Sequence, residues 1–465
     1  MNRTYIAELN KKVGEEVNIC GWVDVRRDHG KLIFIDLRDM SGKVQMVALP
    51  NHKEAHTLAN TVRSEWVLEV SGKVNARPEK MVNKDEINGA VEIEVLCINV
   101  LNEAITPAID VRGDGIEIGE DARLKYRYLD LRRPRMQKNI RNRSKVMTLT
   151  RILLEKEGFC EIETPTLTKA TAEGSRDFII PSRLEKGKFY VLPQSPQQYK
   201  QLLMASGFEK YFQFARCYRD EDSRGDRQPE FTQMDLEMSF ATEEDVMNVN
   251  EKIVIEIVNK LYPQKKIQEI PFPKISYKEA MEKYGTDKPD IRKDKNDKDL
   301  LAFAWIVDFP MFEKADNGKW TFTHNPFSAT KAESFDDLMA KKNIDKIMAA
   351  QYDLALNGNE MGGGSIRNHR PEALRKVLEI MDFDDAKIEK EYGHMLKAFE
   401  TGTPPHGGIA WGLDRMIMIL ENEPNIREVI AFAKTGEGRD LMMDAPTEVS
   451  AEQLRELGIE IKKKK

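Results

Sequence analysis

Five short segments rich in β-branched residues, with one helical stretch between the third and the fourth, fill the first hundred residues and constrain the fold most strongly. Turn pairs (His29-Gly30 and Ser41-Gly42) separate the first three segments. The helical stretch runs from His52 to Arg63. The five segments are Val17–Arg26, Lys31–Arg38, Lys43–Leu49, Trp66–Val74 and Val91–Leu101. This pattern predicts a small β-barrel with one short helix.

Three strands, a helix and two strands follow one another as in the OB-fold, a five-stranded barrel whose open face often binds oligonucleotides. A generic barrel without a ligand gives the same pattern, so the order of the elements leaves nucleic-acid binding open. We predict that this N-terminal five-stranded OB-fold β-barrel occupies residues 1–104.

The composition excludes several classes of protein. With 465 residues, 40% hydrophobic and 32% charged, the chain is neither disordered nor short enough for one ordinary core. It has no run of eighteen apolar residues, and its start lacks the apolar core of a signal peptide, so we expect no membrane segment. The four cysteines form no CxxC pair, which predicts a reducing, cytoplasmic location.

The rest of the chain reads as a hinge and a second domain. Proline and glycine interrupt residues 105–135, where we predict the hinge, and a helical pattern starts at about Pro134. From Gly158 onward, strands and helices mix without the βαβ rhythm of a doubly wound sheet. We therefore predict an α+β domain over residues 136–465, built on an antiparallel sheet with flanking helices.

A basic segment crosses the predicted domain boundary. Between Arg123 and Lys145 there are ten lysines and arginines but only one acidic residue, Asp130. A solvated helix face is the usual interpretation of such a run. The position between two domains favours a nucleic-acid contact instead.

Two polar segments of the second domain suggest phosphate chemistry, although the chain contains neither a P-loop nor a strand-borne GxGxxG. Residues 218–240 read as a hairpin whose loop carries several arginines and acids, suited either to phosphate binding or to solvated ion pairs. Residues 407–420 lead from glycines into an apolar helix with one arginine, Arg415, which needs a partner. A bound phosphate or an internal acid such as Asp414 would supply it.

These segments resemble the signature motifs of class II aminoacyl-tRNA synthetases. Gly158-Phe159 with Glu163-Thr164-Pro165 matches the first motif, the hairpin around Arg219 matches the second, and Gly412–Arg415 matches the third. Further matches include GWVDVRRDHGKLIFIDLRD, QSPQQYKQLLM and GTPPHGGIAWGLDR. Over nearly the whole chain the sequence is similar to bacterial-type aspartyl-tRNA synthetases. The resemblance implies a homodimer that forms aspartyl-adenylate from aspartate and ATP and then transfers aspartate to tRNA.

The resemblance also implies which residues do this. Arg219 and Arg415 would be catalytic, and Asp353 and Glu360 would bind Mg²⁺. The ATP-binding residues would be Arg219, Asp220, Glu221, Gln228, Phe231, Glu360, Gly412, Leu413, Asp414 and Arg415. The aspartate-binding residues would be Glu173, Ser195, Gln197, Lys200, Arg219, Asp235, His324 and Arg367. Two cations matched to a carboxylate would reject asparagine, whose amide leaves them unpaired.

In the barrel, the resemblance implies that Phe34, Arg26 and Gln45 read the anticodon. A core position for Phe34 is the alternative. His29 resembles members that charge both tRNA(Asp) and tRNA(Asn), whereas Lys80 stands where such members tend to have glycine. Charging of tRNA(Asn) would require an amidotransferase downstream. A strictly tRNA(Asp)-specific enzyme, an asparaginyl-tRNA synthetase and a noncatalytic RNA-binding paralogue remain the alternatives.

The chain departs from the bacterial-type pattern in two places. Members usually carry a large inserted domain between the second and third motifs, and here only a short charged stretch near residues 293–300 occupies that position. The insert lies outside the motifs, so we expect activity to survive its loss. Asn325 replaces a histidine that many relatives have beside His324.

Overall fold

The computed structural model describes residues 2–170 and 173–462 and divides the chain into two compact units, Met1–Val111 and Arg112–Lys465. The boundary falls inside the stretch predicted to be a hinge. The helices α2 (Glu120–Lys125) and α3 (Arg127–Asp130) belong to the second unit. Among the described residues, no helix has the length and apolar character needed to cross a membrane.

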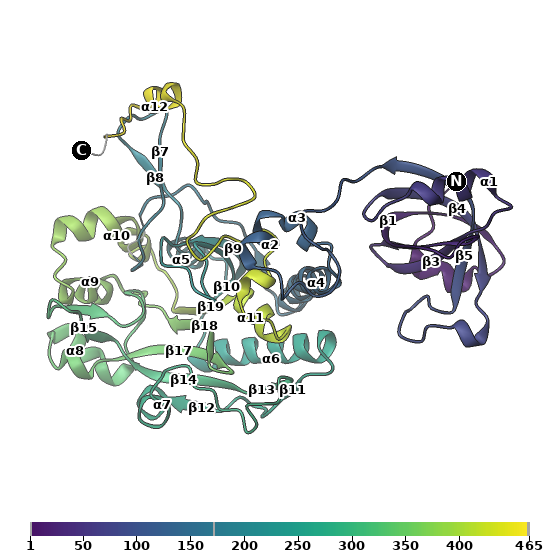
Figure 1. Ribbon diagram of the computed structural model, residues 1–465. Coiled ribbons are helices and arrows are strands. Elements are labelled where there is room, and N and C mark those ends of the chain that lie inside the picture. Colours follow the sequence, from purple (N-terminus) through teal and green to yellow (C-terminus); the bar gives the residue numbers. More distant parts are fainter. Residues whose placement is uncertain (1, 171–172, 463–465) are drawn as a thin grey trace. The chain divides into compact units, whose positions relative to one another are not determined.

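The first unit is the predicted barrel, closed in the strand order β1-β2-β3-β5-β4 (Figure 1). Only the β3–β5 pair is parallel. Alternate residues fill the barrel, so Ile33, Ile35 and Leu37 lie in the core while Phe34 is half-buried outside it. The elements are β1 (Glu16–Asp28), β2 (Ile33–Asp39), β3 (Gly42–Ala48), α1 (Lys53–Thr61), β4 (Val67–Ala76) and β5 (Val91–Asn102).

The second unit is built on an eight-stranded sheet, and its α+β class is as predicted. The sheet is antiparallel except at both edges, where β12 pairs with β14 and β6 pairs with β9 in parallel; the sequence pattern had not indicated these two pairs. In spatial order the strands are β12 (Lys274–Ser276), β14 (Phe303–Pro310), β17 (Met348–Leu356), β18 (Asn359–Ile366), β19 (His406–Gly412), β10 (Glu230–Ser239), β9 (Lys210–Tyr218) and β6 (Cys160–Glu161).

Helices pack on both sides of this sheet. They are α4 (Pro134–Lys156), α5 (Gln197–Ala205), α6 (Glu243–Leu261), α7 (Tyr277–Tyr284), α8 (Phe335–Ala340), α9 (Pro371–Ile380), α10 (Asp385–Phe399) and α11 (Leu413–Leu420). Helix α12 (Ala451–Leu457) has no buried residue and lies away from the sheet (Figure 1). The short pairs β7–β8 (Ile179–Pro181, Phe189–Val191), β11–β13 (Lys266–Ile267, Leu300–Leu301) and β15–β16 (Phe312–Lys314, Trp320–Phe322) lie outside the sheet.

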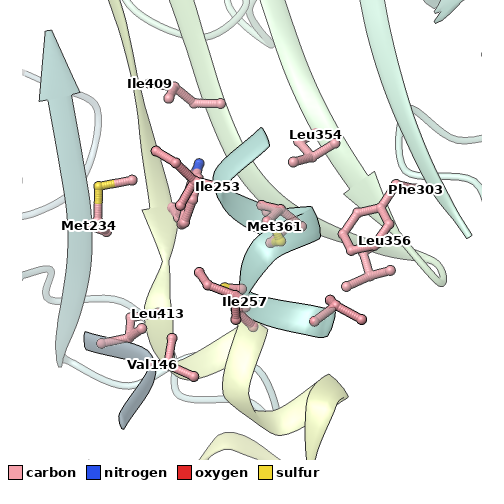
Figure 2. Packing of buried hydrophobic residues seen from close by; sticks show 14 of the residues in the cluster. Val146, Met234, Ile253, Ile257, Phe303, Leu354, Leu356, Met361, Ile409 and Leu413 are labelled. Atoms are coloured by element: carbon pink, nitrogen blue, oxygen red, sulfur yellow. The ribbon is translucent and has the colours of Figure 1, made fainter. Parts of the chain in front are cut away.

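The main core lies between one face of the sheet and helices α4, α6 and α11. Figure 2 shows Ile253 and Ile257 of α6 among Met361, Leu354 and Ile409 of the strands. These side chains are fully buried, and burying one of this size contributes about 1.5–3 kcal/mol. Because neighbouring strand residues point to opposite faces, the core fixes which residues face the other side of the sheet.

For three residues of the basic segment the predicted nucleic-acid contact is wrong, because their side chains are buried. Arg123, Arg127 and Arg133 are buried and surround Asp130. Arg123 also pairs with Glu428 at 2.7 Å. We call these five residues the framework cluster. They tie α2, α3 and the start of α4 to residues 427–431, near the C-terminal end of α11.

Candidate active site

The active-site candidate lies on the sheet face opposite the main core. In β10, Met234, Leu236 and Met238 enter the core, so Gln233, Asp235 and Glu237 point the other way. The same alternation in β17 sends Tyr352 and Leu354 into the core and leaves Gln351 and Asp353 on the polar face. Two adjoining cavities open on this face.

The first cavity has a volume of about 210 Å³ and lies between the β9–β10 loop, β18 and the start of α11. Eight of the ten residues expected to bind ATP line it: Arg219, Glu221, Gln228, Phe231, Glu360, Gly412, Asp414 and Arg415. The hairpin predicted around residues 218–240 therefore forms and brings its loop against the third motif. The other two residues lie elsewhere, since Leu413 is in the core and Asp220 lines a neighbouring cavity.

Two buried donors at this cavity have no hydrogen-bond partner among the described residues: the Nε of Arg415 and the Nε2 of Gln228. The remainder of each side chain is anchored. Arg415 Nη2 lies 3.1 Å from Asp226 Oδ2, and its Nη1 donates to the carbonyl of Glu360. Gln228 Oε1 accepts from the Lys434 amide at 2.8 Å. Fixed donors without partners suit an anion or a ring with acceptor atoms.

Arg219 lies at the junction of the two cavities and contacts Phe231 of the first. The guanidinium carbon of Arg219 lies 5.2 Å from the centre of the Phe231 ring, within the range of a cation–π contact. Arg219 lines both cavities, together with Gln233, Glu360 and Ala410. A group bound at Arg219 is therefore reachable from either side.

The second cavity has a volume of about 190 Å³ and is strongly polar. All eight residues expected to bind aspartate line it: Glu173, Ser195, Gln197, Lys200, Arg219, Asp235, His324 and Arg367. They come from six places in the chain, and the fold brings them together.

Four charged side chains at the base of this cavity form what we call the site cluster: Lys200, Asp235, Glu237 and Arg367. All are at most 2% exposed. Lys200 Nζ lies 2.8 Å from Asp235 Oδ2 and 3.3 Å from Glu237 Oε2, and Arg367 Nε lies 2.9 Å from Glu237 Oε1. Burial alone would raise the pKa of Glu237, but Arg367 and Lys200 keep that pKa below its usual value.

Asp235 is the member of the cluster that retains an unused hydrogen-bond acceptor. Its Oδ1 is buried and has no hydrogen-bond partner among the residues that the structure describes. Burial raises the pKa of Asp235, against the attraction of Lys200. A ligand ammonium group would satisfy the unused oxygen and stabilise the charged carboxylate.

The sequence interpretation missed Glu237. The strand period offers a signal, since Asp235 and Glu237 are two residues apart in β10 and must share a face. Strand β19 passes close to the Glu237 carboxylate because position 408 is a glycine. A Cβ at Gly408 would lie 2.1 Å from Glu237 Oε2, so glycine is needed beside the carboxylate.

Residues 173–177 are fastened to the mouth of the second cavity. Ser195 Oγ donates to Glu173 Oε2, and the Ser175 amide donates to Gln194 Oε1 at 3.0 Å. Gln194 Nε2 donates in turn to Asp177 Oδ1 at 2.7 Å. Glu173 is held against Ser195 by these contacts, and both residues line the cavity.

The two residues expected to bind metal come from neighbouring strands. Asp353 is on β17 and Glu360 on β18, and a Cβ at Gly363 would lie 2.9 Å from Asp353 Oδ1 and 3.7 Å from Glu360 Oε1. Asp353 Oδ2 lies 3.1 Å from His324 Nε2. Burial alone would lower the pKa of His324, but the neighbouring Asp353 carboxylate raises that pKa to about 9. Within the described residues, no group of three or more His, Cys, Asp or Glu side chains is arranged to hold a metal ion alone.

On the barrel, Phe34 and Gln45 lie on the outer face of neighbouring strands. Gln45 Oε1 accepts from Arg27 at 3.2 Å, and its Nε2 donates to Glu92 at 3.0 Å. Arg27 and Glu92 are thus part of this surface, although the sequence interpretation named Arg26.

Three further barrel residues had been predicted to contact tRNA. Arg26 donates to the carbonyl of Ala59 at the end of α1. The ring of His29 meets Phe34 edge-on at 5.5 Å between ring centres. Lys80 is exposed in a 3-10 turn.

Comparisons with known proteins agree with this architecture. The family described as tRNA synthetases class II (D, K and N) matches residues 119–436, and the OB-fold nucleic acid binding domain family matches residues 17–101. Among solved structures, an asparaginyl-tRNA synthetase from Pyrococcus horikoshii superposes with a TM-score of 0.76 at 22% identity, covering 94% of this chain and 98% of the other. At that identity the likeness concerns the fold.

Relatives at higher identity cover the whole chain. The aspartate–tRNA(Asp/Asn) ligase of Natranaerobius thermophilus is 40% identical, with 100% of both chains covered. The aspartate–tRNA ligase of Bacillus licheniformis is 37% identical, over 99% of this chain and 98% of its own. The alignment with the first spans 593 positions, of which this chain fills 465, so 128 positions have no residue here. The chain belongs to the class II tRNA synthetases, within their aspartate–tRNA ligase family.

Proposed function

We propose that this protein is an aspartate–tRNA ligase. In the first step, the α-carboxylate of aspartate attacks the α-phosphate of ATP and displaces pyrophosphate, giving aspartyl-adenylate. In the second, the terminal ribose hydroxyl of tRNA attacks the aspartyl carbonyl and releases AMP. The observation that carries the proposal is the pair of adjoining cavities, one with unpartnered donors and one with the site cluster, which meet at Arg219.

Catalysis at this site consists of positioning and charge stabilisation. Phe231 and Gln228 would hold the adenine, and Arg415 would bind the outer phosphates. Arg219 lies where the two substrates meet and would stabilise the charge that develops on the α-phosphate. No covalent enzyme intermediate is required.

The Asp353–Glu360 pair fits Mg²⁺ bound together with ATP. Mg²⁺ prefers oxygen ligands and is commonly held by one or two carboxylates plus substrate phosphates. Two carboxylates beside Gly363, with no group of three or more such ligands among the described residues, match that arrangement. When bound, the ion would neutralise phosphate charge.

The site cluster would select aspartate over asparagine. Lys200 and Arg367 would bind the side-chain carboxylate, and Asp235 Oδ1 would accept from the ammonium group. Asparagine places an amide at the two cations and leaves their charge less compensated. Sites built around a polar group reject analogues that lack it by a factor of about 10⁴.

We further propose that the barrel reads the anticodon through Phe34, Gln45, Arg27 and Glu92, and that the enzyme charges both tRNA(Asp) and tRNA(Asn). Supporting this, His29 lies against Phe34 and one 40%-identical relative is named for both tRNAs. An amidotransferase would then convert aspartyl-tRNA(Asn). A homodimer and a cytoplasmic location, where charged tRNA is consumed, complete the proposal.

Aminoacylation with labelled aspartate on separate transcripts of the two tRNAs tests this function. Charging of both is the expected result. Charging of tRNA(Asp) alone would leave a strict enzyme and refute the role of His29. Charging of neither by folded protein would refute the catalytic proposal.

A further inference from the structure

Asp414 is among the residues expected to bind ATP and lines the first cavity, and the protein also holds its carboxylate from behind that cavity. The residue is 3% exposed and stands at the first turn of α11, immediately before Arg415. Its Oδ2 accepts from the backbone amide of Thr232 in β10 at 3.0 Å. Its Oδ1 accepts from Arg143 Nη1 of α4. Both carboxylate oxygens are therefore bound to protein donors.

This carboxylate joins three elements behind the nucleotide cavity. It sits on α11, holds β10 through a backbone amide and holds α4 through a guanidinium. The Arg143 side chain is 15% exposed, so the ion pair is largely shielded from water. Hydrogen bonds between charged groups in such surroundings are stronger and more directional than those between neutral groups.

The two residues next to these contacts line the cavity, as Asp414 itself does. Phe231 precedes Thr232 in β10, and Arg415 follows Asp414 in α11. The distance between the adenine-stacking ring and the phosphate-binding guanidinium therefore depends on the bond from Thr232 to Asp414. Displacements of about 1 Å in a catalytic site can cost a factor of about 100 in rate.

We infer that Asp414, oriented by Arg143, is a positioning residue that sets the spacing of Phe231 and Arg415 and thereby the affinity for ATP. Arg143 is a positioning residue acting through Asp414. The identity of the ligand as ATP rests on the proposed function. The contacts of Asp414 concern the shape of the first cavity alone. The cavity that would hold the amino acid is bounded by other residues.

The variants Asp414→Asn, Arg143→Met and Arg143→Lys, with the double variant R143M/D414N, test this inference. Aspartate-dependent ATP–pyrophosphate exchange gives separate KM values for ATP and aspartate, and calorimetry gives the Kd of a non-hydrolysable ATP analogue. We expect D414N and R143M each to raise the KM and Kd for ATP at least tenfold and to change the KM for aspartate less than twofold. The double variant should resemble the single ones, and R143K should recover part of the affinity.

Glu421→Gln is the matched control. Glu421 lies at the far end of α11, where its Oε1 accepts from Asn142 of α4 and from Tyr262, and it lines neither cavity. The Glu421→Gln variant should have a lower melting temperature and an unchanged KM for ATP. D414N with unchanged ATP affinity, or with both KM values raised equally, would overturn the inference, and so would additive effects in the double variant.

If D414N does not fold, R143M and R143K decide by the same readouts. Failure of the proposed function is distinguishable, because wild-type protein would then show no aspartate-dependent exchange. The calorimetric comparison of ATP binding would still test the spacing of the first cavity.

Discussion

Two groups of buried charge in the second unit differ in how completely their hydrogen-bonding atoms are used. In the framework cluster, Arg127 donates to Asp130 and to the carbonyls of Ala431 and Ile430, each at 2.8 Å. In the site cluster, Asp235 retains a buried oxygen without a partner in the described part of the chain, and the cluster lines a cavity. A buried charged group whose hydrogen-bonding atoms all have protein partners stabilises the fold. A buried charged group beside a cavity that retains an unpaired atom is available to a ligand.

The largest effect is expected from Lys200→Met in the site cluster. The substitution removes one cation that would bind the substrate carboxylate and leaves Glu237 with less compensation. We expect kcat/KM for aspartate in pyrophosphate exchange to fall by a factor of about 10³ or more. Tight binding of ATP by the same folded variant would show that the loss concerns the second cavity alone. Retained aspartate activity would contradict the assignment of this cluster.

Arg127→Met should disrupt the framework cluster and lower the stability of the fold without changing the kinetic constants of the folded enzyme. It leaves Asp130 and three backbone carbonyls short of a donor, and removing one partner of a buried ion pair costs about 3–5 kcal/mol. Denaturant unfolding measures the loss of stability. The KM values of the folded variant should match the wild type, and a selective change in either KM would show that the two clusters are coupled.

A smaller effect concerns His406, which is fully buried on β19 next to the site cluster. Burial lowers its pKa to about 4, even though Glu237 pulls the pKa upward. The folded state thus binds a proton less readily than the unfolded state, whose histidine has a pKa of about 6.5. The free energy of unfolding should therefore decrease as the pH falls from about 6.5 to 4, by up to about 3 kcal/mol from this residue.

Urea unfolding at a series of pH values measures this slope, and His406→Gln should flatten it. The framework acid Glu428 adds to the loss only in the lower part of this range, because Arg123 and Arg135 hold its pKa below the usual value against burial. The difference between wild type and His406→Gln therefore isolates the histidine. An unchanged slope in the variant would contradict the role of His406.

The smallest change in stability is expected for an ion pair that is exposed to water and lies away from both cavities. Arg151 and Glu161 pair at 2.9 Å with side chains 43% and 35% exposed. Glu161→Gln should change the free energy of unfolding by less than about 1 kcal/mol, because water screens the pair. A loss comparable to that of Arg127→Met would show that pairing, rather than burial and saturation, determines stability here.

The barrel was predictable from sequence because its signal is local. Alternating apolar residues and turn pairs placed each strand to within a few residues, and the same alternation places Phe34 outside the core. The edges of the large sheet gave no such signal, since β6 and β12 are only two and three residues long.

The charge clusters show where local reasoning ends. The framework arginines look like a solvated run because the distant partners of Arg123 and Arg127, Glu428 and the carbonyls of residues 427–431, lie about 300 residues away. Asp353 and Glu360 converge only through the pairing of β17 with β18, so motif resemblance, and not composition, pointed to them. Glu237 could have been predicted from the two-residue period of β10. The contacts of Asp414 with Thr232 and Arg143 could not, because a motif does not show which protein groups a side chain bonds.

The preference for aspartate over asparagine in ATP–pyrophosphate exchange tests the account most directly. In the proposed site, two cations of the site cluster would face the substrate side chain, so kcat/KM for aspartate should exceed that for asparagine by a factor of about 10⁴. Comparable exchange with both amino acids, or a preference for asparagine, would contradict the assignment of Lys200 and Arg367 to the side-chain carboxylate.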